Sequence, residues 1–182
     1  SNLVSDTGVV ATDTTGVGTA RRSLAGAAYG GDKAIFGFGI GSSNNVRTTN
    51  LVSNTGVVGS DNNTTGQSAY SLGAAGYGGD KAIFGFGIYG EELNKTNLVS
   101  NTGVVGSDVT GVGTPKEGLA AAGYGGDKAI FGYGRAYTMP GYTLEMYNHT
   151  NLVSNTGVVS LDQANVGTAR INLAAAGYSS TA

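Results

Sequence analysis

The residue types that could carry out catalysis are few in this chain. Glycoside hydrolysis needs two nearby carboxylates, and the glutamates that could supply them are Glu91, Glu92, Glu117 and Glu145. The chain has one histidine, His149, and no cysteine, which excludes a cysteine nucleophile and a metal site built from several histidines. The sequence therefore predicts a protein that is not an enzyme and has no cofactor, and a glycosidase is the weakest alternative.

Repeated aspartates could instead hold a cation or form ion pairs. One set, Asp13, Asp61, Asp108 and Asp162, offers a single carboxylate per repeat, which is a poor cage for Ca²⁺. The other set is followed at once by lysine, as in Asp32–Lys33, and neighbours on a strand face opposite ways. Turn formation is the favoured role for both sets, so we predict no metal site.

Aromatic and polar side chains gather in three segments of variable length, residues 40–48, 88–96 and 135–150. The third is the longest and carries three tyrosines, two methionines and the histidine. Aromatic side chains are enriched at binding interfaces, although this segment could equally pack on itself. The predicted binding residues are Asn44, Asn45, Arg47, Tyr89, Glu91, Asn94, Arg135, Tyr137, Tyr142, Tyr147 and His149.

Two phrases recur along the chain and define a repeat. "YGGDKAIFGFG" begins at Tyr29 and Tyr77 and returns as "YGGDKAIFGYG" at Tyr124, while "NLVSNTGVV" or "NLVSDTGVV" begins at Asn2, Asn50, Asn97 and Asn151. The intervals between the copies of the second phrase are 48, 47 and 54 residues. A period of this size is typical of propellers and solenoids.

Each repeat divides into four short strands, which in the first repeat are residues 23–29, 33–39, 49–53 and 57–60. Gly-Gly-Asp and Asn-Thr-Gly supply the turns between them. Four antiparallel strands per repeat predict the blades of an all-β propeller, with a β-solenoid as the rival. The first strand is nearly all Ala and Gly, so we expect it nearest the axis, where strands crowd. The two tight turns then share one face, and the variable segments lie on the other.

The order of these parts resembles a kelch repeat. The stretch "TARRSLAGAAYGGDKAIFGFG…TNLVSNTGVV" combines an arginine-containing lead-in, a small-residue strand, a turn, an aliphatic-aromatic strand, a variable loop and a final strand. It departs from kelch where Gly37-Phe38-Gly39 replaces the glycine doublet and Val57-Val58 stands in place of the late tryptophan. The repeats are also similar to those of structural and tail-associated proteins of bacteriophages. These resemblances imply a kelch-like β-propeller and a virion or extracellular location.

The repeat boundaries predict one propeller, or part of one, over residues 1–182. Complete blades run over about 21–60, 69–107 and 116–161, and a split blade combines 1–12 with 169–182. Three arrangements remain open: a compact four-bladed ring with one defective blade, a larger ring shared by two chains, or a piece of a longer chain.

Composition narrows the partners. The ten Lys and Arg residues are scattered and the net charge is −2, which argues against nucleic acid, and no apolar run approaches the ~20 residues that span a bilayer. The leading hypothesis is a non-enzymatic structural or interaction module whose variable face binds a protein, or whose copies associate to complete the ring. The main alternative is a carbohydrate-binding lectin, in which Asn44, Asn45, Tyr89, Asn94 and Tyr142 line sugar pockets.

Overall fold

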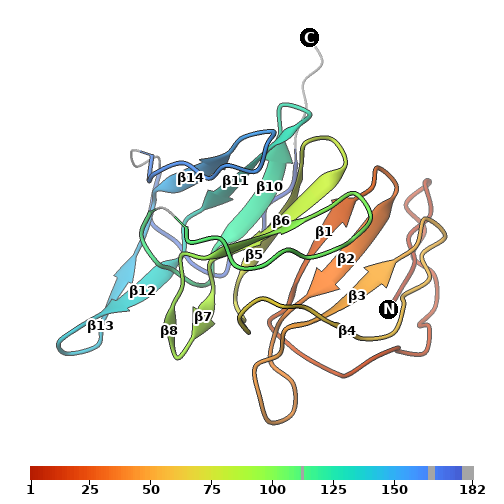
Figure 1. Ribbon diagram of the computed structural model, residues 1–182, viewed down its shortest axis with the longest axis horizontal. Helices are drawn as coiled ribbons and strands as arrows, with labels where there is room; N and C mark the ends of the chain where they lie inside the picture. Colours follow the sequence, from red (N-terminus) through yellow and green to blue (C-terminus); the bar gives the residue numbers. More distant parts are fainter. Residues whose placement is uncertain (112, 164–166, 178–182) are drawn as a thin grey trace.

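The chain folds into small antiparallel sheets (Figure 1). The structure is a computed structural model and describes residues 1–111, 113–163 and 167–177. Within these residues there is no helix and no closed ring or barrel, and hence no helix long and apolar enough to cross a membrane. The all-β prediction is confirmed.

Three sheets repeat the same plan, one per predicted repeat. Their strands pair in the order small-residue strand, Lys-Ala-Ile-Phe-Gly strand and Thr-Asn-Leu-Val strand. The strands are β1 (Ala25–Tyr29), β2 (Lys33–Gly37) and β3 (Thr48–Val52); β5 (Gly73–Tyr77), β6 (Lys81–Gly85) and β9 (Thr96–Val99); β10 (Ala120–Tyr124), β11 (Lys128–Gly132) and β14 (Thr150–Val153).

The predicted fourth strand is reduced to single bridges. Val58 bridges Val52 in the first repeat, and the later repeats have the same contact. The turn has Gly56 at a φ of +79°, and the Gly59 amide donates to the Leu51 carbonyl beyond the bridge. The Gly59 carbonyl accepts from the Asn50 side chain and not from a backbone amide of the third strand. Only the first sheet gains a fourth strand, the two-residue β4 (Asn62–Asn63), which pairs with the start of β3.

The small-residue strands let the sheets approach closely. β5 lies between β1 and β10, and a Cβ atom on Gly76 would stand 3.3 Å from the Ala28 carbonyl oxygen. The same position is occupied by Gly123 in the next repeat, 3.4 Å from the Gly76 oxygen, and by Gly177 after it, 3.0 Å from the Gly123 oxygen. Larger side chains would push the sheets apart, so the composition of the strand sets the spacing.

A phenylalanine from each later sheet seals the contact with the sheet before it. Phe84 packs over Gly37, where a Cβ would stand 2.7 Å from the ring, and its ring meets Phe38 edge-on at 5.1 Å. Phe131 repeats this over Gly85, against Phe86 at 5.2 Å. Both Phe84 and Phe131 are fully buried. The aromatic rings thus form the core between sheets, and the glycines make room for them.

The recurring aspartates tie each repeat together. Asp61 accepts a hydrogen bond from the Asn50 amide at 2.9 Å and from the amide and hydroxyl of Thr19 at 2.9 and 2.7 Å. The Thr19 hydroxyl is the largest cause that lowers the pKa of Asp61. Asp162 makes the equivalent bonds to Asn151 and Thr114. Asp108 accepts from the Asn97 side chain and from the Gln67 backbone amide. The prediction that this set only forms turns is corrected: these carboxylates bind the lead-in segment to the third strand of the same repeat.

The Gly-Gly-Asp and Asn-Thr-Gly turns lie on one face, as predicted. The Asn155 amide donates to Asp127 at 3.1 Å and so joins the two turns of the third repeat. The lysine after each of these aspartates also pairs with it, at 2.9 Å for Lys33 and 2.7 Å for Lys81. The expectation that Asp and Lys face opposite ways is wrong here, because the aspartate lies in the turn and not in the strand.

Candidate binding groove on the variable face

A groove lies between two hairpins built from the variable segments of the second and third repeats. The first hairpin joins β7 (Ile88–Tyr89) to β8 (Glu91–Glu92), and the second joins β12 (Arg135–Thr138) to β13 (Thr143–Met146). Figure 1 shows both hairpins extending from the same side of the sheets. The groove encloses about 600 Å³ and is lined by Ile88, Gly90, Glu91, Glu92, Thr114, Pro115, Ala136, Tyr137, Thr138, Met139, Tyr142 and Tyr147.

Local sequence explains the larger hairpin. β12 pairs with β13 from Arg135 opposite Met146 to Thr138 opposite Thr143. The turn between them places Gly141 at a φ of +111°, a value that favours glycine. A hydrogen bond of 3.0 Å from the Tyr137 amide to the Glu92 carboxylate joins this hairpin to β8. The two variable segments therefore form one surface, and the alternative in which the third packs only on itself is not what the structure shows.

The tip of the β12–β13 hairpin is apolar and exposed. Met139 is 69% exposed and Tyr142 72% exposed. Leu144 and Met146 on β13 are also exposed, whereas Ala136 and Tyr147 are buried at the base of the groove. An exposed cluster of large apolar side chains on one projecting element is typical of an interaction site.

The ionisable groups that line the groove floor and walls are acidic. Glu91 and Glu92 both line it. Arg135 borders the groove but is paired: its Nε donates to Glu117 at 3.1 Å and its guanidinium lies 5.4 Å from the Tyr137 ring centre. The charged side chains in the lining itself are therefore both carboxylates.

A buried polar cluster supports the base of the groove. The Lys116 ammonium donates to the Asn151 side chain at 2.7 Å and lies 4.8 Å from the centre of the Phe86 ring. Burial lowers the pKa of Lys116 to about 8. Burial, and then the charge of Lys116, lower the pKa of His149, whose ring stacks against Tyr147 at 4.7 Å. The neutral form of His149 is therefore favoured, and its ring packs against Tyr147, which lines the groove.

Four of the predicted binding residues line the groove: Glu91, Tyr137, Tyr142 and Tyr147. The structure does not bring the others into it. Asn44, Asn45 and Arg47 belong to the variable segment of the first repeat, where Asn45 bridges Ile40. The Asn94 amide donates to the carbonyl oxygens of Gly111 and Gly113, Tyr89 is exposed but outside the groove, and Arg135 and His149 act as described above.

The groove residues that were not in the predicted binding set are Ile88, Gly90, Glu92, Thr114, Pro115, Ala136, Thr138 and Met139. Of these, Thr114 and Pro115 lie outside the three variable segments. They belong to the connection between the second and third repeats, next to the Asp162 that binds the Thr114 hydroxyl at 2.7 Å. The predicted geometry places the connections between repeats on the variable face. Thr114 and Pro115 could therefore have been predicted from their position in the repeat, although not from their residue types.

No protein-family model matches this chain, and no curated protein matches it in sequence. Among the described residues, no group of three or more His, Cys, Asp or Glu side chains is placed to hold a metal ion.

Proposed function

We propose that this chain is a non-enzymatic interaction module that binds a protein segment in the groove between the β7–β8 and β12–β13 hairpins. The observation that carries the proposal is the exposed apolar tip, where Met139 and Tyr142 project beside the groove. Large, exposed aromatic and methionine side chains are enriched in protein interfaces. Isolated exposed residues would mean little, but these two share one hairpin and one cavity.

The groove also suggests the chemistry of its partner. Tyrosine faces attract cations, and Glu91 and Glu92 add negative charge to the same cavity. We therefore propose a partner segment that pairs an apolar side chain with Lys or Arg. Both lining glutamates come from one short strand, not from opposing walls. A glycosidase needs its two carboxyls on either side of the scissile bond, and this is why we propose binding without catalysis.

The proposed architecture is a kelch-like β-propeller in which each sheet is a blade. It is supported by the adjacent small-residue strands β1, β5 and β10 and by the matching register of the three hairpins. Ring completion, by the termini or by association of copies, is part of this proposal. Residues 178–182 of the predicted split blade lie outside the described residues. The resemblance to bacteriophage tail-associated repeats extends the proposal to a virion or tail assembly.

Selection of short random peptides on the intact chain tests the protein-binding proposal. We expect enriched peptides to contain Lys or Arg beside an apolar residue. Tyr142→Ala should weaken their binding by about tenfold or more, the scale of an interface anchor, whereas Tyr89→Ala, which removes an exposed tyrosine outside the groove, should not. Peptides that bind both variants and the parent equally would contradict the proposal.

A carbohydrate ligand is the second candidate, and a specific observation favours it. The groove combines three tyrosines with the hydroxyls of Thr114 and Thr138 and two carboxylates, a set that can stack on a sugar ring and bond its hydroxyls. A broad glycan array probed with the intact chain distinguishes the candidates. Binding that Tyr142→Ala abolishes would support the lectin, and no binding across the panel would remove it.

A further inference from the structure

The outer edge of β12, which faces the groove, is only partly paired. Arg135 and Glu117 form an antiparallel bridge on this edge, with backbone bonds of 2.9 Å in both directions. Alternate residues of a strand bond to the same side, so the next residue of β12 on this edge is Tyr137. In the register of the bridge, the residue opposite Tyr137 is Pro115, which has no amide hydrogen to donate. Among the described residues, the backbone pairing of this edge therefore ends after one bridge.

Glu92 takes the place of the missing backbone partner. Its carboxylate accepts the Tyr137 amide at 3.0 Å and so ties β8 to β12 across the groove. The second repeat has the same bridge, between Tyr70 and Ile88, but its shorter hairpin already turns at Gly90, where φ is +75°. The side-chain bond therefore belongs to the longer hairpin, whose edge extends beyond the bridge.

Glu91, the neighbouring carboxylate, has no such bond. Its side chain is exposed, whereas that of Glu92 is partly buried. Within the part of the chain that the structure describes, no hydrogen bond or ion pair engages the Glu91 carboxylate. Arg135, beside the groove, is already paired with Glu117 at 3.1 Å. Glu91 is therefore free to bind a cation in a cavity where Tyr142 also offers an aromatic ring.

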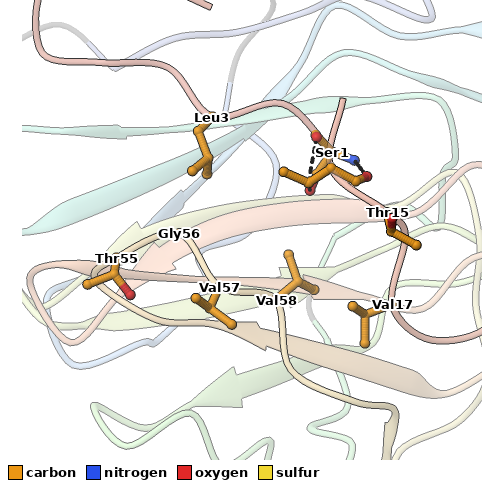
Figure 2. A pocket seen from close by; sticks show the side chains of 9 residues that line it. Ser1, Leu3, Thr15, Val17, Thr55, Gly56, Val57 and Val58 are labelled. Carbon is orange, nitrogen blue, oxygen red and sulfur yellow. Dashed lines mark hydrogen bonds between the residues drawn. The ribbon is translucent and has the colours of Figure 1, made fainter. Parts of the chain in front are cut away.

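A cavity of about 220 Å³ beside the first repeat has no comparable group. Figure 2 shows Leu3 and Ser1 on one side of it and Val17, Val57 and Val58 on the other. Its lining contains no ionisable side chain, so no side chain there can select a charged ligand over an apolar one.

Two further cavities contain a charged side chain, and in each cavity that side chain is paired. In the cavity of about 310 Å³, Arg21 lies 3.8 Å from Asp61. In another of about 180 Å³, the Lys81 ammonium lies 2.7 Å from Asp80. Glu91 differs from both cations because its charge has no partner among the described residues.

We propose that the two glutamates have separate roles: Glu92 is a positioning residue that holds the two hairpins together, and Glu91 binds the Lys or Arg side chain of the partner segment. This inference rests on the proposed function, because it assigns the preference for a cationic partner to one residue. The two carboxylates are adjacent in sequence, but only Glu91 can bind a ligand with both oxygens and leave the β12 edge satisfied.

Matched peptides test the role of Glu91. A lysine-containing peptide selected on the intact chain is compared with the same peptide carrying norleucine, which removes the ammonium and keeps most of the stem. We expect the parent chain to favour the lysine peptide by about threefold or more, and less so at high salt. Glu91→Gln should abolish this preference without changing the affinity for the norleucine peptide, whereas Glu92→Gln should retain most of it. An undiminished preference in Glu91→Gln, or an equal loss in both variants, would overturn the proposal.

Amide hydrogen exchange tests the role of Glu92 without any ligand. Glu92→Ala removes the acceptor of the Tyr137 amide, so we expect this amide to exchange about threefold faster or more, the scale of one hydrogen bond. Glu92→Gln keeps a side-chain oxygen and should restore the parent rate. Thr138, whose backbone faces β13, is the internal control. Equal exchange at Tyr137 in the parent and in Glu92→Ala would show that Glu92 does not hold the hairpin.

The failure of this inference can be told apart from the failure of the proposed function. Glu92→Ala should weaken the lysine and norleucine peptides by the same factor, and Glu92→Gln should restore both, because positioning does not depend on the charge of the ligand. If no selected peptide depends on Tyr142, the proposed function is wrong and the role of Glu91 is wrong with it. If binding depends on Tyr142 but the preference for lysine does not depend on Glu91, the groove binds its partner and only the assignment to Glu91 fails.

Discussion

Phe84→Ala is expected to lower the free energy of unfolding by about 3–5 kcal/mol, the range for truncating a buried phenylalanine. Phe84 is fully buried between the first and second sheets. Its ring fills the space above Gly37 and contacts Phe38 edge-on. Alanine would leave a cavity that the surrounding sheets cannot close, because their spacing is already set by the small-residue strands. Urea unfolding followed by circular dichroism measures the loss.

Phe36→Ala is the matched control for this prediction. It makes the same substitution at the same position of the repeat, but the ring is 40% exposed, and among the described residues no sheet covers it. We expect a loss of about 1–2 kcal/mol, because the ring is only partly buried and its removal leaves no enclosed cavity. Equal losses in the two variants would mean that packing between sheets does not hold the molecule together.

The stability of the parent chain relative to Lys116→Met is expected to rise by about 3 kcal/mol between pH 8 and pH 10.5. Burial lowers the pKa of Lys116 from 10.5 to about 8. Between these values the unfolded chain holds a proton that the folded chain lacks, so stability increases with pH. A shift of this size corresponds to about 1.4 kcal/mol per pH unit. Below pH 8 the folded chain bears the full cost of burying the Lys116 charge, and above pH 10.5 this cost is absent.

Parallel denaturation curves of the two proteins across this pH range measure the difference. Methionine keeps the length of the side chain without its charge, and other titrating groups cancel in the comparison. Lys33→Met is the control, since Lys33 is exposed beside Asp32, whose hydrogen bond raises its pKa. We expect no rise for the parent relative to that variant over the same interval. A flat difference for Lys116→Met would mean that the ammonium is already well solvated in the folded state.

Local features of the fold could be predicted from the repeated phrases. The Lys-Ala-Ile-Phe-Gly strands, the positive-φ Gly-Gly turns and the shared face of the tight turns depend on residues close in sequence, and the structure has them as expected. The fourth strand was overpredicted: Val58 alone forms a bridge there, and the next carbonyl, that of Gly59, accepts from the Asn50 side chain. The carboxylates of Asp61 and its equivalents were misjudged because their partners, such as Thr19, are about 40 residues away.

The candidate groove could be predicted in part. Variation in length pointed to the right segments, and tyrosine enrichment pointed to Tyr137, Tyr142 and Tyr147. The sequence could not show which variable segments contact one another, because these contacts depend on how neighbouring sheets are oriented. The second and third segments converge, whereas the first, with Asn44, Asn45 and Arg47, does not contribute to this groove.

The sequence by itself determined the repeat, the strand order within each sheet and the small-residue strand that allows sheets to approach. These follow from short-range geometry, which is the same in every copy of the phrase. Only the tertiary structure decided how deeply the equivalent residue of each repeat is buried. Phe36, Phe84 and Phe131 all lie in a Lys-Ala-Ile-Phe-Gly strand, yet Phe84 and Phe131 are fully buried and Phe36 is 40% exposed. The physical reason is that burial depends on which sheet lies above a residue, and that neighbour comes from a different part of the chain.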